Sequence, residues 1–349
     1  MTERLYYHDS YLRHFAAQAE ECAGDGSTVY LDRTAFYPTS GGQPFDLGSI
    51  AGIAVREVID EGDRIAHLLA APLAAGPVEC SIDWNRRFDH MQQHTGQHLL
   101  SAVFEELFHL RTVSFHLGAE SSTIDLEGGA VDTRMAAAAE ARSNEIVREN
   151  RPVGVAYEDA ASVQGLRKAT EREGTLRIVS IDGLDRSACG GTHVRATGEI
   201  GTVLLRKLEK VRQTVRVEFL CGGRAIRRAR ADYEALSRVA QLFSASLDEA
   251  PGMVAAQVET ARTVEKARRK LDWTSPRTRA RSSTGTPFRV RTGCAGWCAA
   301  PPRAVWTSFA LWRRISRRSR GPYSWLRCSR RHRCCWQRPR TPAWTRDRS

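Results

Sequence analysis

The sequence contains no continuous apolar run that approaches the roughly 18 residues of a membrane-spanning helix. Its first eight residues, MTERLYYH, also lack the apolar core of a secretory signal peptide. These two absences argue against a membrane or secreted protein and predict a cytoplasmic location. The scattered cysteines Cys22, Cys80 and Cys221 fit this prediction as reduced packing residues.

Lysine is absent from residues 273–349, and Asp347 is the only acidic residue there. Because this stretch holds 19 arginines, it carries a formal charge of +18. The whole chain carries +12, so the preceding 272 residues carry 12 − 18 = −6. A basic charge often indicates a nucleic-acid-binding protein, but here it belongs to the C-terminal stretch alone.

The stretch 273–349 also lacks hydrophobic periodicity, although it holds seven of the eight tryptophans and five of the nine cysteines. Disordered segments are normally poor in both residues, and folded ones show a pattern. We hypothesise that a frameshift near Asp272 in a GC-rich gene replaced the natural C-terminus. A disordered or arginine-rich RNA-binding tail is the alternative. The spacing of its cysteines matches no zinc template: Cys294, Cys298, Cys328, Cys334 and Cys335.

Two short stretches carry the most specific chemical signal. His94 and His98 lie four positions apart, which places both on one face if the segment is helical. Cys189 and His193 form a second pair with the same spacing. Zinc favours imidazole and thiolate ligands in tetrahedral geometry, and the two pairs together would supply three histidines and one cysteine.

Each pair alone has a structural alternative. A histidine on a helix face is usually structural, and two histidines with this spacing occur by chance in many proteins. A zincin protease is excluded, because that motif needs Glu directly after the first His and Thr95 stands there. The second stretch is more telling. Gly190 and Gly191 break a helix, and a metal or substrate lying close to bare backbone would explain them.

The pairing of HTGQHLLSA with DRSACGGTHV resembles the editing domain of alanyl-tRNA synthetase, and resembles even more the free-standing alanyl-tRNA editing proteins of the AlaX type. The resemblance runs from about Leu5 to about Leu271. It implies that His94, His98, Cys189 and His193 bind zinc. It further implies a hydrolase that deacylates mischarged tRNA for alanine, carrying serine or glycine.

The resemblance also implies substrate-binding residues. The breaker-rich stretch 32–44 would by pattern alone be a turn. In the family, a similar loop helps to form the substrate pocket, which makes candidates of Thr39, Ser40, Gly41 and Gly42. His116, on a strand that lines the pocket in the family, is a further candidate. Gln97 stands where synthetase-borne domains often have Thr, so the preference between seryl and glycyl substrates stays open.

The periodicities predict an α+β fold. We expect a small N-terminal β-barrel domain over residues 1–86 and a two-layer α/β zinc-binding editing domain over 87–223. A helical or coiled-coil arm would follow over 224–272, and then the tail 273–349. Within the editing domain the patterns predict two helices and five strands: helices over 87–110 and 135–150, a hairpin of 112–118 with 122–126, and strands over 177–181, 202–208 and 215–219.

Several questions stay open at the level of the sequence. Zinc could activate a water molecule or anchor the amino group of the substrate. A non-catalytic, zinc-stapled RNA-binding module is the alternative function. The expected partner is tRNA, with a possible homodimer through the helical arm. We expect the acceptor stem to contact a basic surface made of Arg206, Lys207, Lys210 and Arg212, helped by Arg224, Arg227 and Arg228.

Overall fold

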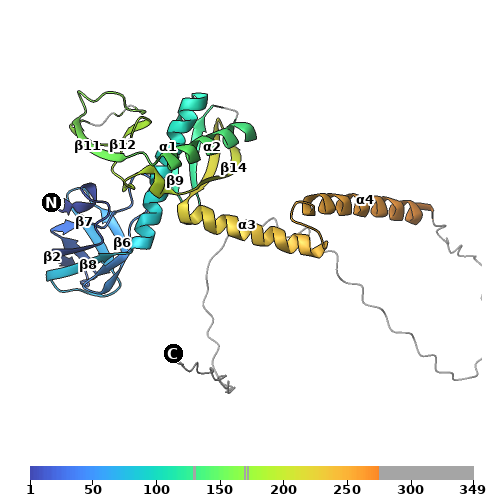
Figure 1. The fold of residues 1–349 in the computed structure, drawn as a ribbon. Coiled ribbons are helices and arrows are strands. Elements are labelled where there is room, and N and C mark those ends of the chain that lie inside the picture. The colour runs from blue at the N-terminus through green and yellow to red at the C-terminus, as the bar shows by residue number, and fades with distance from the viewer. Residues whose placement is uncertain (129–130, 169, 171–172, 275–349) are drawn as a thin grey trace, which may run out of the picture. The chain divides into compact units, whose positions relative to one another are not determined.

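The computed structural model describes residues 1–128, 131–168, 170 and 173–274. They form a mixture of helices and sheets (Figure 1). The predictions about the tail fall, from residue 275 onward, outside the described residues. Among those described, no helix combines the length and the apolar character that crossing a membrane requires.

The expected β-barrel is present near the N-terminus and closes on itself with six strands. Their order around the barrel is β2 (His14–Ala23), β3 (Thr28–Leu31), β7 (Ile65–Leu69), β6 (Ile53–Asp60), β5 (Gly48–Ile50) and β8 (Gly76–Ile82). Along β2, buried Phe15, Ala17 and Ala19 alternate with exposed neighbours, which directs every second side chain into the barrel. A short parallel pair, β1 (Glu3–Arg4) with β4 (Arg33–Thr34), lies beside η1 (Leu5–Tyr7).

The long helix α1 (Trp84–Phe108) carries the first histidine pair. It begins three residues before the predicted start, because Asp83 caps it by accepting a hydrogen bond from the backbone of Arg86. It ends at His109, which adopts the left-handed conformation with φ 56°. The helix has an apolar face that includes Met91, Leu99 and Val103, and these three side chains are buried.

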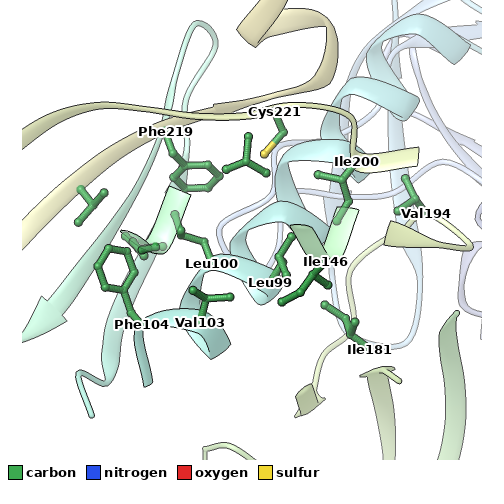
Figure 2. Close-up of a cluster of buried hydrophobic side chains, with 14 of the residues drawn as sticks. Leu99, Leu100, Val103, Phe104, Ile146, Ile181, Val194, Ile200, Phe219 and Cys221 are labelled. Atoms are coloured by element: carbon green, nitrogen blue, oxygen red, sulfur yellow. The ribbon is translucent and has the colours of Figure 1, made fainter. Parts of the chain in front are cut away.

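A four-stranded antiparallel sheet has the order β14, β15, β10, β9. Its strands are β9 (Thr112–Leu117), β10 (Ser122–Glu127), β14 (Val203–Val211) and β15 (Thr214–Cys221). Side chains from α1, this sheet and helix α2 (Thr133–Glu149) meet in one hydrophobic core. Figure 2 shows Leu99, Leu100, Val103 and Phe104 of α1 in this core with Ile146 of α2 and Phe219 of β15. The core holds α1 rigidly at the turns that bear the histidines.

A second, three-stranded sheet consists of β11 (Val153–Asp159), β12 (Thr175–Ile181) and β13 (Asp185–Ala188). The sequence did not predict β13, because its four residues, DRSA, show no apolar alternation. It pairs with β12, and it delivers Cys189 to the metal-ligand cluster directly after its last residue.

The turn η2 (Thr197–Ile200) leads toward β14, and the helices α3 (Gly222–Leu242) and α4 (Ala250–Thr274) follow β15. Both helices expose large apolar side chains, among them Leu242, Val264 and Leu271. The division into an editing domain and a separate helical arm stays a prediction.

Candidate metal centre

Four side chains from two distant parts of the chain meet at one point. His94 and His98, on consecutive turns of α1, face Cys189 and His193 of the loop after β13. One ligand atom from each residue lies within 4.8 Å of all the others. The three histidines are buried, and Cys189 is half-buried. The structure therefore brings together all four residues that the sequence singled out as metal ligands.

The spacing and chemistry of this cluster suit zinc. Bonds of about 2.0–2.1 Å to nitrogen and about 2.3 Å to sulfur would separate tetrahedral ligand atoms by about 3.3–3.7 Å. Cys189 Sγ lies 3.5 Å from His94 Nε2 and 3.4 Å from His193 Nε2. Three imidazoles and one thiolate are also a donor set that zinc prefers.

Each histidine is oriented through its other ring nitrogen. Nδ1 of His94 lies 2.8 Å from Oε1 of buried Gln43, and Nδ1 of His98 lies 2.8 Å from Oδ2 of Asp185. Nδ1 of His193 lies 3.1 Å from Oγ1 of Thr95. The Gln43 amide oxygen and the Asp185 carboxylate accept a hydrogen bond, which places a proton on Nδ1 of His94 and of His98 and directs Nε2 of each ring toward a metal. The Thr95 hydroxyl, which also accepts from the backbone N–H of Val194, holds the His193 ring in place.

The charges in the cluster favour its metal-binding forms. Burial alone would raise the pKa of Cys189, but the neighbouring imidazoles of His94 and His193 lower that pKa well below its ordinary value. Burial likewise opposes ionisation of Asp185, yet its bonds to His98 and Arg167 lower its pKa. Burial lowers the pKa of His193 to about 3. A thiolate and neutral imidazoles are the forms that bind zinc.

The ionised Asp185 has the opposite effect on its histidine partner. Burial acts to lower the pKa of His98, but the hydrogen bonds to Asp185 and Cys189 and the negative charges of these two residues together outweigh it and raise the pKa to about 9. Because the bond to Asp185 engages Nδ1, a metal would compete only with the proton on Nε2.

The two glycines of the second stretch have different environments. A Cβ on Gly191 would lie 2.2 Å from Cε1 of His94, whereas a Cβ on Gly190 would make an ordinary contact with Tyr7 at 3.6 Å. The loop is held by Arg177, whose Nη1 donates to the backbone oxygens of Cys189 at 2.7 Å and Gly191 at 3.0 Å. Bare backbone at Gly191 therefore lets the loop pack against a ligand ring.

Gly191→Ala is expected to lower the metal affinity by about 10–100-fold, the range found when the surroundings of a ligand are disturbed. The added methyl group would force the His94 ring away from Gln43. Gly190→Ala is the matched control and should bind metal like the unchanged protein. Competition with a chromogenic chelator measures both affinities. Equal affinities in the two variants would contradict the packing argument.

A cavity of about 420 Å³ adjoins the cluster. Its lining includes the ligands His94, His98 and Cys189, and three of the predicted substrate-binding residues, Ser40, Gly41 and Gln97. The Nε2 of Gln97 donates to Oγ of Ser101 at 2.9 Å, so the amide oxygen is the group that it can present.

The other three predicted substrate-binding residues are not among those that line the cavity. Thr39 accepts a hydrogen bond from the backbone of Phe45 within its own loop. Gly42 packs on β9, where its oxygen accepts from the Leu117 backbone at 3.2 Å. His116 is exposed, and its neighbour Phe115 takes the cavity position, stacked on His94 with a ring separation of 5.3 Å.

Sequence reasoning missed the residues that orient the ligands: Gln43, Thr95, Arg177 and Asp185. Three of them stood inside stretches already singled out, and Gln43 belongs to the stretch 32–44. Thr95 directly follows His94, and Asp185 opens the stretch DRSACGGTHV. A carboxylate near a potential His–Cys site is a typical partner for a ligand histidine, and this signal could have identified Asp185.

Several known proteins are similar to this chain. Residues 176–218 match the family described as the threonyl and alanyl tRNA synthetase second additional domain. The alanyl-tRNA editing protein AlaX-L of Pyrococcus horikoshii is 38% identical over 241 residues, which cover 65% of this chain and 59% of that protein. The mouse alanyl-tRNA editing protein Aarsd1 is 34% identical over 245 residues, which cover 64% of this chain and 60% of that protein.

The chain thus spans about three fifths of the length of these two relatives. A shorter relative is matched almost completely. The alanyl-tRNA editing protein AlaX-M of Methanosarcina acetivorans is 37% identical over 231 residues, which cover 60% of this chain and 94% of that protein. On this similarity, the chain belongs to the family of alanyl-tRNA editing proteins.

Proposed function

We propose that this protein is a zinc-dependent trans-editing hydrolase that deacylates mischarged tRNA for alanine in the cytoplasm. In this reaction, water forms a new bond to the carbonyl carbon of the amino acid. The ester bond between that carbon and the ribose oxygen breaks. The ribose oxygen takes up a proton, and the free amino acid and uncharged tRNA leave.

The observation that carries this proposal is the position of the ligand cluster in the cavity wall. His94, His98 and Cys189 line the same cavity as Ser40 and Gly41. These two residues belong to the stretch 32–44, which we call the glycine-rich loop. A metal that only stabilised the fold would not need to adjoin a cavity. The similarity to three relatives that are named alanyl-tRNA editing proteins supports the same activity.

Four protein ligands would hold the metal: His94, His98, Cys189 and His193. When bound, zinc supplies a positive charge that can polarise an ester or lower the pKa of a water molecule. The remaining lining groups would position the substrate. The amide oxygen of Gln97 can accept a hydrogen bond from a seryl hydroxyl or from an amino group. The ammonium of Lys168, also in the lining, favours an approaching phosphate.

The test is hydrolysis of seryl-tRNA and glycyl-tRNA, both made on tRNA for alanine, with correctly charged alanyl-tRNA as the control. We expect the purified protein to deacylate at least one mischarged substrate faster than alanyl-tRNA. A strong chelator should remove this activity, and added zinc should restore it. Hydrolysis that survives complete metal removal would contradict the zinc dependence.

The alternative is a non-catalytic RNA-binding module stapled by zinc. The closed set of four protein ligands favours it, because structural zinc sites are typically closed. In that case the protein would bind tRNA, and every aminoacyl ester would be hydrolysed only at the rate of the uncatalysed reaction. The same assay therefore separates the two functions.

We further propose that α3 and α4 pair with a second copy of the chain. Leu242, Val264 and Leu271 are more than half exposed, although burial would stabilise each of them. Analytical ultracentrifugation over a concentration series should show a dimer. A monomer at all concentrations would contradict this assembly.

A further inference from the structure

A second and larger cavity lies on the other side of the glycine-rich loop. Its volume is about 710 Å³, and it shares no lining residue with the metal cavity. Aromatic and cationic side chains face it together. Trp84, Phe88 and Arg86 come from the start of α1, and Gly223 and Arg227 come from the start of α3. The proposed reaction has no role for these residues.

The two cavities are neighbours along three elements. On α1, His90 lines the second cavity and His94 the first, one helical turn or about 6 Å apart. In the glycine-rich loop, Gly41 lines the first cavity and Pro44 the second. Phe115 of strand β9 lines the first cavity, and Gly118, in the turn after β9, lines the second cavity. A linear ligand could therefore occupy both.

The start of α3 has the features of an anion site. Its N-cap residue, Cys221, makes no side-chain hydrogen bond to the first turn. The positive end of the helix dipole therefore faces the cavity at Gly223. The side chain of Arg227 is 73% exposed and lies 3.9 Å from Asp89, too far for a strong hydrogen bond.

A buried polar atom in the cavity wall gives an independent indication. His90 is 2% exposed, and its Nδ1 has no hydrogen-bond partner among the described residues. Burial and the nearby guanidinium groups of Arg86 and Arg224 together lower the pKa of His90 to about 3. The lining of the cavity holds the guanidinium groups of Arg86, Arg224 and Arg227 against the single carboxylate of Asp89, and this excess of positive charge would attract an anion.

Arg227 also differs from four of the six other basic residues that the sequence suggested for RNA contact, and the remaining two, Lys210 and Arg212, are not among the residues that line the cavity. Arg206 and Arg228 both pair with Asp232, and Lys207 pairs with Glu209 at 2.8 Å. Arg224 is buried against Asp89, and its Nη1 also donates to the backbone oxygen of Gly118 at 2.7 Å. Arg224 therefore braces the cavity wall, while Arg227, whose ion pair with Asp89 is long at 3.9 Å, presents most of its side chain to solvent and to a ligand.

We propose that this second cavity binds one nucleotide of the single-stranded 3′ end of the RNA substrate. Its phosphate would bind the Arg227 guanidinium and the Gly223 backbone N–H, and its base would pack against Trp84 and Phe88. Single-stranded RNA is recognised by this combination of stacked bases and paired phosphates, whereas a duplex keeps its bases hidden. The inference rests on the proposed function, because the terminal ester would then occupy the metal cavity.

The test compares Arg227→Ala with Arg238→Ala in the full-length protein. Both arginines are exposed on α3, so each change removes one surface charge, but Arg238 lies outside the cavity. The probe is an RNA hairpin with a single-stranded 3′ end ending in CCA. An excess of unlabelled blunt hairpin saturates the sequence-blind binding that the +18 stretch would cause.

Arg227→Ala should weaken binding of the CCA-ended hairpin about tenfold. It should also reduce the slope of log affinity against log salt concentration by about one, because one fewer phosphate is neutralised. Arg238→Ala should stay within about twofold of the unchanged protein. Replacing the single-stranded bases with abasic nucleotides should also weaken binding of the unchanged protein, because stacking is lost. Equal binding by the two variants would overturn the phosphate site, and tight binding of the abasic end would overturn the base contact.

A hydrolysis assay separates this inference from the proposed function. Seryl-adenosine carries the ester but no phosphate, so both variants should cleave it as fast as the unchanged protein does. On seryl-tRNA, only Arg227→Ala should raise KM, with kcat unchanged. If no variant hydrolyses either substrate, the proposed function fails, while the binding measurements still decide the second site. A loss of seryl-adenosine cleavage in Arg227→Ala would overturn the assigned role.

Discussion

Cys189→Ala is expected to remove bound metal and deacylase activity together. Cys189 supplies the only sulfur of the cluster, and the other described cysteines, Cys22, Cys80 and Cys221, lie outside it. The variant would retain the three imidazoles and lose the thiolate, the one anionic ligand that would offset the charge of the metal. The loss of affinity should therefore exceed the roughly 100-fold that disturbing an outer partner can cost.

Metal analysis of protein purified without chelator measures the first effect, and deacylation of seryl-tRNA measures the second. Cys22→Ala is the matched control, because Cys22 is also half-buried but lies in the barrel strand β2. The control should keep both metal and activity. Full metal content in Cys189→Ala would remove this residue from the site, whereas retained activity without metal would separate metal binding from catalysis.

The four candidate ligands could be predicted from the sequence, but Gln43, which orients one of them, could not. His94, His98, Cys189 and His193 reveal themselves by residue type and by a spacing of four. Gln43 carries no such signal, since a glutamine in a loop is ordinary in any protein. It becomes a partner of His94 only because the fold buries it against Thr192, 149 positions away. Such pairings are made by tertiary structure, which local pattern does not encode.

The secondary structure, too, could be predicted only in part. The α1 helix was predictable because Met91, Leu99 and Val103 recur with the helical period and are buried together. The strand β13 was not, because Asp185 and Ser187 are polar residues that are buried through hydrogen bonds. On β9, Phe115 lines the metal cavity, whereas the predicted substrate-binding residue His116 is exposed. Strand alternation placed Phe115 and His116 on opposite faces, and the sequence alone could not say which face meets the metal.

A buried ion pair fixes the glycine-rich loop to α1, and breaking it should strongly destabilise the protein. Arg87 and Asp46 are both fully buried, and Nε of Arg87 lies 3.0 Å from each carboxylate oxygen. Asp46 also accepts from the backbone N–H of Tyr37, at 2.6 Å, and Tyr37 lines the metal cavity. The pair therefore joins the helix that carries His94 to the loop that carries Gly41.

Asp46→Asn should lower the free energy of unfolding by about 3–5 kcal/mol, because the Arg87 guanidinium would stay buried without a counter-charge. Asparagine can still accept from Tyr37, so the lost charge is the main change. Arg87→Met in the same chain should recover part of the loss by removing the unpaired charge. Glu209→Gln, which breaks an exposed pair with Lys207, is the control and should cost less than about 1 kcal/mol. Urea unfolding at saturating zinc measures all three proteins. A double variant less stable than Asp46→Asn alone would show that the Arg87 side chain stabilises the fold by packing rather than through its pairing with Asp46.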